Sequence, residues 1–513
     1  MISLPPQFGE KYDLLFRNVL IYDGSGLPPF FGDVAVQGDR IAAVEQLGVI
    51  PQGTAASEVD LAGLALAPGF IDSHTHDDRI ILDAPNMLPK ISQGVTTVIV
   101  GNCGISLAPV TFSSGSPPPP MNLLGDEGAY EFSCFADYAE RVRKTVPAVN
   151  VAALIGHSSL RLATMADIQK PASEQEISAM CALADEAMEQ GAIGFSSGLF
   201  YLTNAAATPQ EVIAVATRFA QHGGVYATHM RDEFDQVLES IEESLSSAGA
   251  ASIPLIVSHH KCAGVANWGR SLETLPVLEA ASYRQEVNLD VYPYSAGSTY
   301  LRLDLVTDTY PIRIAWSKPY PEMRGRDLVE IAKEWGVDIH EAAEKLQPAG
   351  AIYFQMNEAD VRRVLSSRLA MIGSDGLPLD DHPHPRLWGT FPRVIGHYAR
   401  DLQLFSMETA IHKMTGLTAQ VFRLKDRGQI RPGAFADLVV FDPARIIDRA
   451  TYDEPIQLSD GILSVYVNGV RSYSAEAGVE SRAGRLIGNS NEEFRRPVEC
   501  VQTHHEQGTE FPQ

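Results

Sequence analysis

The sequence is poor in cysteine and in positive charge, and it has no long hydrophobic run. Its five cysteines in 513 residues are scattered and odd in number, which argues against a disulfide framework and favours a reducing cytoplasm. Lysine and arginine number 40 against 64 aspartate and glutamate residues, giving a net charge of -24. This balance argues against nucleic acid or an anionic membrane as a partner. No stretch approaches the ~18 consecutive apolar residues of a membrane span, and residues 1–18 lack a secretory signal pattern.

The length exceeds that of one typical domain, and the two ends of the chain share a pattern that the middle lacks. Apolar and polar residues alternate near both termini, as in half-buried strands, over residues 18–22, 33–44, 433–442 and 465–470. Four such strands are too few for two separate domains. We therefore expect one small β-sandwich domain built from residues 1–65 and 415–475, followed by a tail over 476–513.

The middle of the chain alternates short apolar runs with amphipathic helical stretches. Eight runs read as strands, at residues 66–71, 96–100, 149–155, 192–196, 225–228, 254–258, 287–291 and 369–373. Helical stretches separate several of them, at residues 173–190, 209–222, 234–248 and 272–285. Eight such units predict an α/β fold, a closed (β/α)₈ barrel over residues 66–414. The connection at about 292–366 is longer than a usual crossover, so we expect an insertion there that forms a mobile lid over the barrel mouth.

Histidines follow the first predicted barrel strand in the pattern His74-Thr75-His76. Residues two apart on a strand point to the same side, so both imidazoles converge at the strand's C-terminal end, where barrel enzymes keep their active sites. The next strand ends in Gly101-Asn102-Cys103-Gly104, whose glycines permit positive φ and close backbone approach. A thiolate beside imidazoles is a good zinc ligand, so Cys103 becomes a candidate ligand.

Two further strands end in histidine, at His229 and at His259. A lone histidine is more often a satisfied core residue, but four strands ending in ligand-type residues favour a metal site. The eighth strand ends in Ser374-Asp375-Gly376, and the position of Asp375 at the rim suggests a general base rather than a helix cap.

This set of residues resembles the amidohydrolase superfamily. The opening stretch 68–76 (PGFIDSHTH) and the closing stretches 428–430 (GQI) and 433–439 (GAFADLV) look like that superfamily's motifs, and the resemblance covers nearly all of residues 12–470. No lysine ends a strand at the level where many members carry a carboxylated lysine. Several stretches instead resemble the N-acyl-D-amino-acid deacylases, or D-aminoacylases: GNCG at 101–104, GH at 156–157, GFSSGLFY at 194–201, THMR at 228–231, SHHK at 258–261, DVYPY at 290–294 and HPR at 384–386.

The resemblance implies roles for individual residues. One tightly held zinc would lie on Cys103, His229 and His259, and a weaker second site would lie on His74 and His76 and share the cysteine. The resemblance also implies that Lys261, Tyr292 and Ser298 hold the carboxylate of an anionic N-acyl amino acid and that Tyr201 lines the pocket. We add Arg386 as a second candidate cation in a loop after Asp375, and the role of His157 stays open.

The predicted reaction is zinc-dependent hydrolysis of an N-acyl-D-amino acid, with Asp375 moving the proton. Lys261 lies two residues past a predicted ligand, so it can present a local cation to an anionic substrate in this acidic protein. Three alternatives stay open: a cyclic amide or a dipeptide as substrate, a deacylase restricted to D-glutamate or D-aspartate, and a non-catalytic barrel. The acyl group, the side chain and the oligomeric state do not follow from the sequence.

Overall fold

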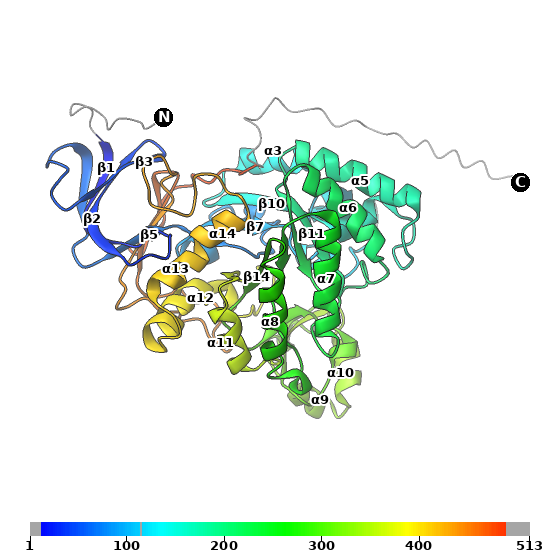
Figure 1. Ribbon diagram of the computed structural model, residues 1–513. Coiled ribbons are helices and arrows are strands. Elements are labelled where there is room, and N and C mark those ends of the chain that lie inside the picture. The colour runs from blue at the N-terminus through cyan, green and yellow to red at the C-terminus, as the bar shows by residue number, and fades with distance from the viewer. Residues whose placement is uncertain (1–11, 113–114, 489–513) are drawn as a thin grey trace, which may run out of the picture.

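Eight parallel strands form the central sheet of the computed structural model, which describes residues 12–112 and 115–488 (Figure 1). They follow one another around the sheet in chain order, and each overlaps a run expected to be a strand. The strands are β6 (Phe70–Asp72), β7 (Val95–Val100), β10 (Asn150–Gly156), β11 (Gly194–Gly198), β12 (Val225–His229), β13 (Leu255–Val257), β14 (Val287–Val291) and β18 (Ala370–Ile372). Their inward side chains pack into a buried cluster, so the predicted barrel is confirmed and its interior is filled.

The barrel closes between its first and last strands with few backbone bonds. β6 and β18 share no ladder, and one isolated bridge joins Thr75 to Gly376. Ser73 N donates to Ile372 O at 3.3 Å, and Asp375 N donates to His74 O at 2.8 Å. Gly373 permits this approach, because a Cβ there would lie 2.5 Å from the Cβ of His74. This closure seam therefore runs beside the predicted ligands and the predicted base.

Helices cover the outside of the barrel (Figure 1). The four expected helical stretches are present as α5 (Glu174–Glu189), α6 (Pro209–Gln221), α7 (Val237–Ala251) and α8 (Ser271–Ala281). Ser173 and Glu176 form a capping box that begins α5. The other α-helices of the described barrel region are α1 (Ile80–Asp83), α2 (Leu88–Ile91), α3 (Phe135–Thr145), α4 (His157–Thr164), α11 (Glu358–Ser366), α12 (Arg386–Arg393), α13 (Met407–Met414) and α14 (Gly416–Val421).

Both ends of the chain build a second, smaller sheet, as expected. It has nine strands in the order β22-β21-β20-β19-β5-β1-β2-β3, with β4 beside β1. The strands are β1 (Tyr12–Ile21), β2 (Phe30–Gln37), β3 (Arg40–Gln46), β4 (Ala55–Asp60), β5 (Ala65–Pro68), β19 (Leu438–Phe441), β20 (Ile462–Val467), β21 (Val470–Ser474) and β22 (Gly478–Val479). Figure 1 shows the blue N-terminal strands beside orange and brown segments from the C-terminal part of the chain in this domain.

The run at 66–71, which we expected to be one barrel strand, is divided between the two sheets. β5 pairs with β1 and β19 of the small domain, whereas β6 pairs with β7 of the barrel. Gly69 separates them because its backbone packs against Thr96, where a Cβ would lie 2.2 Å from that side chain. We propose that the domain boundary lies at this glycine rather than after residue 65.

The long connection after β14 folds into a subdomain with its own core. Its antiparallel sheet consists of β15 (Gly297–Tyr300), β17 (Ala349–Tyr353) and β16 (Ile312–Ser317), with α9 (Leu328–Trp335) and α10 (Ile339–Leu346) packed against it. An insertion was expected here and is present, and its role as a mobile lid stays a prediction. The apolar residues recur every three to four positions in α9 and α10, which is the helical spacing. The last part of the expected insertion is α11, which packs against α8 and β18 as a barrel helix.

The described part of the expected C-terminal tail packs on the molecule. β22 extends the small sheet, and beyond it Val151 N donates to Arg485 O at 2.9 Å and Ile487 N donates to Val151 O at 2.7 Å. Residues 489–513 lie outside the described residues. No described helix has the length and apolar character needed to cross a membrane.

Candidate active site

The ends of five barrel strands bring six predicted residues into two groups of metal-ligand atoms. The first donor group consists of Cys103, His229 and His259. The second donor group consists of His74, His76, Cys103 and Asp375, so the thiol belongs to both. Within each group all ligand atoms lie within 4.8 Å of one another, and all six side chains are buried.

Three of these residues have left-handed backbone conformations. The φ angles are 52° at Cys103, 35° at His259 and 50° at Asp375, a region that side-chain-bearing residues seldom occupy. Gly101 and Gly104 have φ angles of 77° and 76°, so the positive φ expected beside Cys103 is present. Such strain is typical of sites where the surrounding fold fixes functional side chains.

Cys103 lies between two imidazoles. Its Sγ is 3.2 Å from His74 Nε2 and 3.3 Å from His259 Nε2. Burial opposes the thiolate, but these histidines hold the pKa of Cys103 well below its usual value. The thiolate is the form that binds a metal, so the electrostatics suit the ligand role.

His229 supports the presence of a metal. Both of its ring nitrogens are buried without a hydrogen-bond partner among the described residues, and Glu233 Oε2 lies 3.6 Å from Nε2. Burial lowers the pKa of His229 to about 4, so the imidazole is neutral at neutral pH and has a free lone pair. Buried polar atoms normally have partners, and a zinc ion on the first donor group would satisfy one of these nitrogens.

Glu233 is a site residue that the sequence interpretation missed. Its Oε1 lies 3.0 Å from His259 Nδ1 and 2.7 Å from Lys261 Nζ. With Nε2 of His259 directed at the thiol, Nδ1 faces both the Glu233 carboxylate and the Lys261 ammonium, whose Nζ lies 2.7 Å from it. A carboxylate beside the second ring nitrogen is the usual support for a ligating histidine. The signal in the sequence was a carboxylate four residues after His229, which is too common a spacing to interpret alone.

Asp375 contacts both predicted histidines of the second donor group and a buried arginine. Its Oδ1 is 3.2 Å from His76 Nε2 and 3.6 Å from His74 Nε2, and its Oδ2 is 2.9 Å from Arg386. Burial opposes ionisation, but Arg386 and then His76 lower the pKa of Asp375 well below its usual value. The carboxylate is therefore ionised at neutral pH, as a proton acceptor must be.

Arg386 was expected in a loop, but it is the first residue of α12 and is fully buried. It donates to Ser298 O at 3.1 Å and lies 4.6 Å from the centroid of the Tyr292 ring. Its contact with Asp375 makes it a partner of the predicted base.

A cavity of about 510 Å³ adjoins both donor groups. The expected substrate residues Lys261, Tyr292, Ser298 and Tyr201 line it. Lys261 is engaged by Glu233, and the Ser298 hydroxyl donates to Ala351 O at 3.2 Å. Aromatic and aliphatic side chains form much of the remaining wall, namely Leu123, Phe200, Phe234, Leu305, Tyr353 and Leu377. Thr299 and Gln355 add polar groups.

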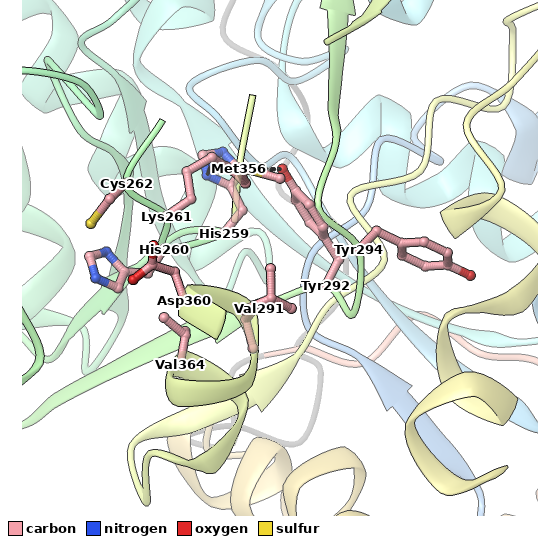
Figure 2. A pocket seen from close by; sticks show the side chains of 11 residues that line it. His259, His260, Lys261, Cys262, Val291, Tyr292, Tyr294, Met356, Asp360 and Val364 are labelled. Carbon is pink, nitrogen blue, oxygen red and sulfur yellow. Dashed lines mark hydrogen bonds between the residues drawn. The ribbon is translucent and has the colours of Figure 1, made fainter. Parts of the chain in front are cut away.

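A smaller cavity of about 300 Å³ shares His259, Lys261 and Tyr292 with the larger one (Figure 2). Figure 2 shows the ends of His259 and Lys261 close to the phenol of Tyr292, whose oxygen lies 3.9 Å from Met356 Sδ. Its remaining walls combine apolar side chains, among them Val291 of β14 and Val361 and Val364 of α11, with the polar side chains of His260 and Asp360.

His157, whose role the sequence left open, belongs to neither donor group. It begins α4, is fully buried, and its Nε2 lies 2.9 Å from Glu211, which also pairs with Arg161. These contacts give it a structural role.

Comparisons with known proteins show the family of this chain. A family model described as the amidohydrolase family matches residues 57–340 and 340–473. The chain is 52% identical to a D-aminoacylase from Alcaligenes xylosoxydans xylosoxydans over 93% of its length and 98% of that protein. A D-aminoacylase structure, described as having a binuclear metal centre, matches with a TM-score of 0.90 and 51% identity, covering 93% of this chain and all of that one. An N-acyl-D-glutamate deacylase from Bordetella bronchiseptica, solved with zinc and a phosphonate that mimics the tetrahedral intermediate, matches with a TM-score of 0.89 and 42% identity over 93% and 100% of the two chains.

Proposed function

Because the chain belongs to the amidohydrolase family, and within it to the D-aminoacylases, we propose that it hydrolyses N-acyl-D-amino acids to a carboxylate and a free D-amino acid. The observation that carries this proposal is the pair of donor groups sharing Cys103, placed beside Asp375 on the wall of one cavity. This combination of metal ligands, a proton acceptor and an adjoining cavity is suited to hydrolysis of an amide.

We propose one tight zinc on Cys103, His229 and His259, and a weaker second site on His74 and His76 that shares the thiol. Three protein ligands with an open fourth position are typical of catalytic zinc. When bound, zinc polarises the scissile carbonyl and makes water more acidic. The unpartnered nitrogens of His229 and the lowered pKa of Cys103 support the first site.

Asp375 performs the proton transfer in this proposal. Arg386 holds its Oδ2, which leaves Oδ1 facing the two histidines and the cavity. Oδ1 takes the proton of the attacking water and delivers it to the leaving amine when the tetrahedral intermediate collapses. Arg386 keeps the carboxylate ionised and oriented, and this buried contact makes it a positioning residue.

Lys261, Tyr292 and Ser298 are proposed to bind the α-carboxylate of the substrate. Lys261 is already paired with Glu233, so the substrate shares its ammonium rather than meeting a free one. The carboxylate at one end and the scissile carbonyl at the other fix the substrate at two points. The side chain of one enantiomer then enters the cavity while that of the other meets the wall, and the D preference rests on the relatives.

The cavity favours an uncharged D-amino-acid side chain over D-glutamate or D-aspartate. Among the described residues, Lys261 is the one cation on its wall, and Glu233 occupies it. Arg302 stacks on Phe200 behind the wall, but Asp304 pairs with it at 2.6 Å. A second substrate carboxylate would therefore lose its hydration without gaining a free partner.

The deciding test compares amine release from N-acetyl-D-methionine, N-acetyl-L-methionine and N-acetyl-D-glutamate, with a hydantoin and a dipeptide assayed beside them. We expect kcat/KM for D-methionine to exceed the L-isomer by at least ~100-fold, or ~3 kcal/mol. We expect it to exceed D-glutamate by at least ~10-fold. Equal rates on the two methionine isomers would favour the cyclic-amide or dipeptide alternatives, and a preference for D-glutamate would contradict the uncharged pocket.

Elemental analysis of the purified protein tests the metal proposal and the non-catalytic alternative together. We expect about one zinc per chain after dialysis. Zinc-free protein that stays inactive when zinc is added would support the non-catalytic alternative. We propose a cytoplasmic location from the scattered spacing of the cysteines. In the structure Cys103 is free but Cys134 is disulfide-bonded, which a reducing compartment seldom retains.

A further inference from the structure

We propose that Lys90 is a positioning residue that holds the barrel's closure seam and thereby sets the relative placement of Asp375, His74 and His76. Lys90 lies on α2 and is fully buried. Its Nζ donates to Asp72 Oδ2 at 2.8 Å and to Ser374 Oγ at 2.7 Å, and it lies 3.4 Å from Asp77 Oδ2. We call Lys90, Asp72, Asp77 and Ser374 the Lys90 cluster.

Each partner of Lys90 is next to a residue of the second donor group. Ser374 precedes Asp375, Asp77 follows His76, and Asp72 is two residues before His74. Asp72 adds a direct link, since its Oδ1 accepts Ser374 N at 2.7 Å and His74 N at 3.3 Å. One ammonium group therefore connects the loop after β6 with the loop after β18.

The seam needs this connection because its backbone pairing is sparse. The other seven neighbouring pairs of barrel strands are joined by ladders, whereas β6 and β18 have an isolated bridge between Thr75 and Gly376. The Lys90 cluster supplies buried, charge-assisted hydrogen bonds in place of the missing ladder. The hydrogen bond from Asp375 N to His74 O, at 2.8 Å, lies within the span that these contacts tie together.

Stabilisation of the fold alone does not explain the Lys90 cluster. All four side chains are fully buried, and a buried ion pair often stabilises no better than apolar residues of the same volume. Two carboxylates around one ammonium also leave the cluster formally anionic. The hydrogen bonds of the cluster are directional, so they fix the positions of two loops at the level of the donor atoms. Small displacements there have large effects on the reaction rate.

The first donor group is held independently of Lys90. Cys103 follows β7, His229 ends β12, His259 follows β13, and regular ladders join the strands from β7 to β14. The hydrogen bonds and ion pairs of Lys90 Nζ within the described residues go to Asp72, Asp77 and Ser374 alone. Lys90 and the tight zinc can therefore be separated experimentally.

The test is Lys90→Met, which keeps the length of the side chain and removes the charge. We expect kcat to fall ~10- to 100-fold and KM to change less than about threefold, because the carboxylate-binding wall is elsewhere. Binding of Co²⁺ added to the one-zinc protein, followed by visible absorption, should weaken ~10-fold or more at the second donor group. The tight zinc should be retained. The metal-free protein should show amide exchange at least ~10-fold faster in residues 72–77 and 373–376, with 225–229 unchanged.

Two further variants complete the test. Ser374→Ala removes one neutral contact and should fold normally, with a smaller loss of kcat in the same direction. Lys413→Met is the matched control: Lys413 is also buried, and its ammonium donates to the carbonyls of Ser367 and Ala370 at the opposite end of β18. It should leave kcat and second-site Co²⁺ binding unchanged.

Three results would overturn the proposal. The first is seam exchange and kcat within twofold of wild type in both Lys90→Met and Ser374→Ala. The second is a loss of both metals together in Lys90→Met. The third is the same loss of kcat in Lys413→Met. The kcat measurement is the one part of this test that rests on the proposed function.

Metal binding and amide exchange need no substrate. If the substrate assignment were wrong, these two measurements would still test the role of Lys90, so the two failures are distinguishable.

Discussion

Replacing Glu233 by glutamine tests whether the carboxylate that the sequence did not reveal controls the tight metal site. The change keeps the shape of the side chain and removes its charge. In the structure Glu233 Oε1 lies 3.0 Å from His259 Nδ1 and 2.7 Å from Lys261 Nζ, so one carboxylate orients a proposed ligand and neutralises a proposed substrate cation. The variant should therefore change two measurable quantities, the zinc affinity and the KM for substrate.

The expected effect on the metal is a loss of affinity. Partners that accept the second N–H of a ligating histidine typically contribute 10- to 100-fold to metal affinity, or ~1.4 to 2.7 kcal/mol. The glutamine oxygen still accepts a hydrogen bond, so the lower part of this range is expected. The effect on substrate binding has the opposite sense: KM should not rise, because the Lys261 ammonium is no longer shared with a carboxylate. Lys261→Ala, in contrast, should raise KM and reduce the preference for the D-isomer.

Zinc affinity is measured by competition with a chromophoric chelator, and KM by amine release at saturating zinc. Glu243→Gln is a matched control, since Glu243 forms a part-buried ion pair with Arg231 at 2.8 Å, close in sequence to His229 but outside both donor groups. It should leave zinc affinity unchanged. The reasoning is refuted if Glu233→Gln binds zinc as tightly as wild type, or if its KM rises as much as that of Lys261→Ala.

Three further predictions concern single residues. Cys103→Ala should lose the tight zinc and all activity, whereas His74→Ala should lose activity but retain most of that zinc. Elemental analysis and turnover measurements distinguish the two variants. Full zinc content with full turnover in Cys103→Ala would contradict the ligand assignment. Asp375→Asn should fold, keep its tight zinc and lose several orders of magnitude in kcat, so near-normal turnover would remove Asp375 from the mechanism. Burial favours the neutral acid at Glu211, but the hydrogen bond with His157 and the pairing with Arg161 lower its pKa to about 2 from an ordinary 4.5. Because this pKa is lowered in the folded state, the ionised Glu211 stabilises the fold above pH ~4.5, and this contribution is lost as the pH falls toward 2. Glu211→Gln should therefore lower the free energy of unfolding by about 3 kcal/mol at neutral pH and by progressively less below pH ~4.5. Denaturant unfolding across pH measures the difference.

The sequence predicted the elements whose patterns are local. The eight barrel strands and helices α5 to α8 follow from short apolar runs and from amphipathic spacing. The grouping of six donor residues also followed, because parallel strands place their C-terminal ends on one rim. The division of residues 66–71 at Gly69 did not follow, since a continuous apolar run gives no sign that its two halves pair in different sheets.

What the sequence could not show was which charges meet. Lys261 was interpreted as a cation available to the substrate, and Arg386 as a second one, but each is paired with a buried carboxylate. Such pairings join residues of different elements, so no local pattern reports them. Arg386 meets Asp375 from the next helix, and Glu233 meets Lys261 from the loop after β12.

These pairings change how an acidic protein can accept an anionic substrate. A free lysine would attract the α-carboxylate strongly over a wide range of positions. A lysine already paired with Glu233 binds only a carboxylate that reaches the ammonium beside this existing partner. Arg386 is withheld from the substrate by Asp375, and its charge serves to keep that base ionised. The site thus uses its two buried cations for orientation rather than for general attraction. Its selectivity should therefore depend on the placement of the substrate carboxylate more than on substrate charge.

N-acyl-D-methionine amide, which lacks that carboxylate, should lose kcat as well as affinity, because a substrate held at one end alone no longer presents its carbonyl to the site in a single orientation. An amide that kept the kcat of the acid would show that the carboxylate contributes binding alone.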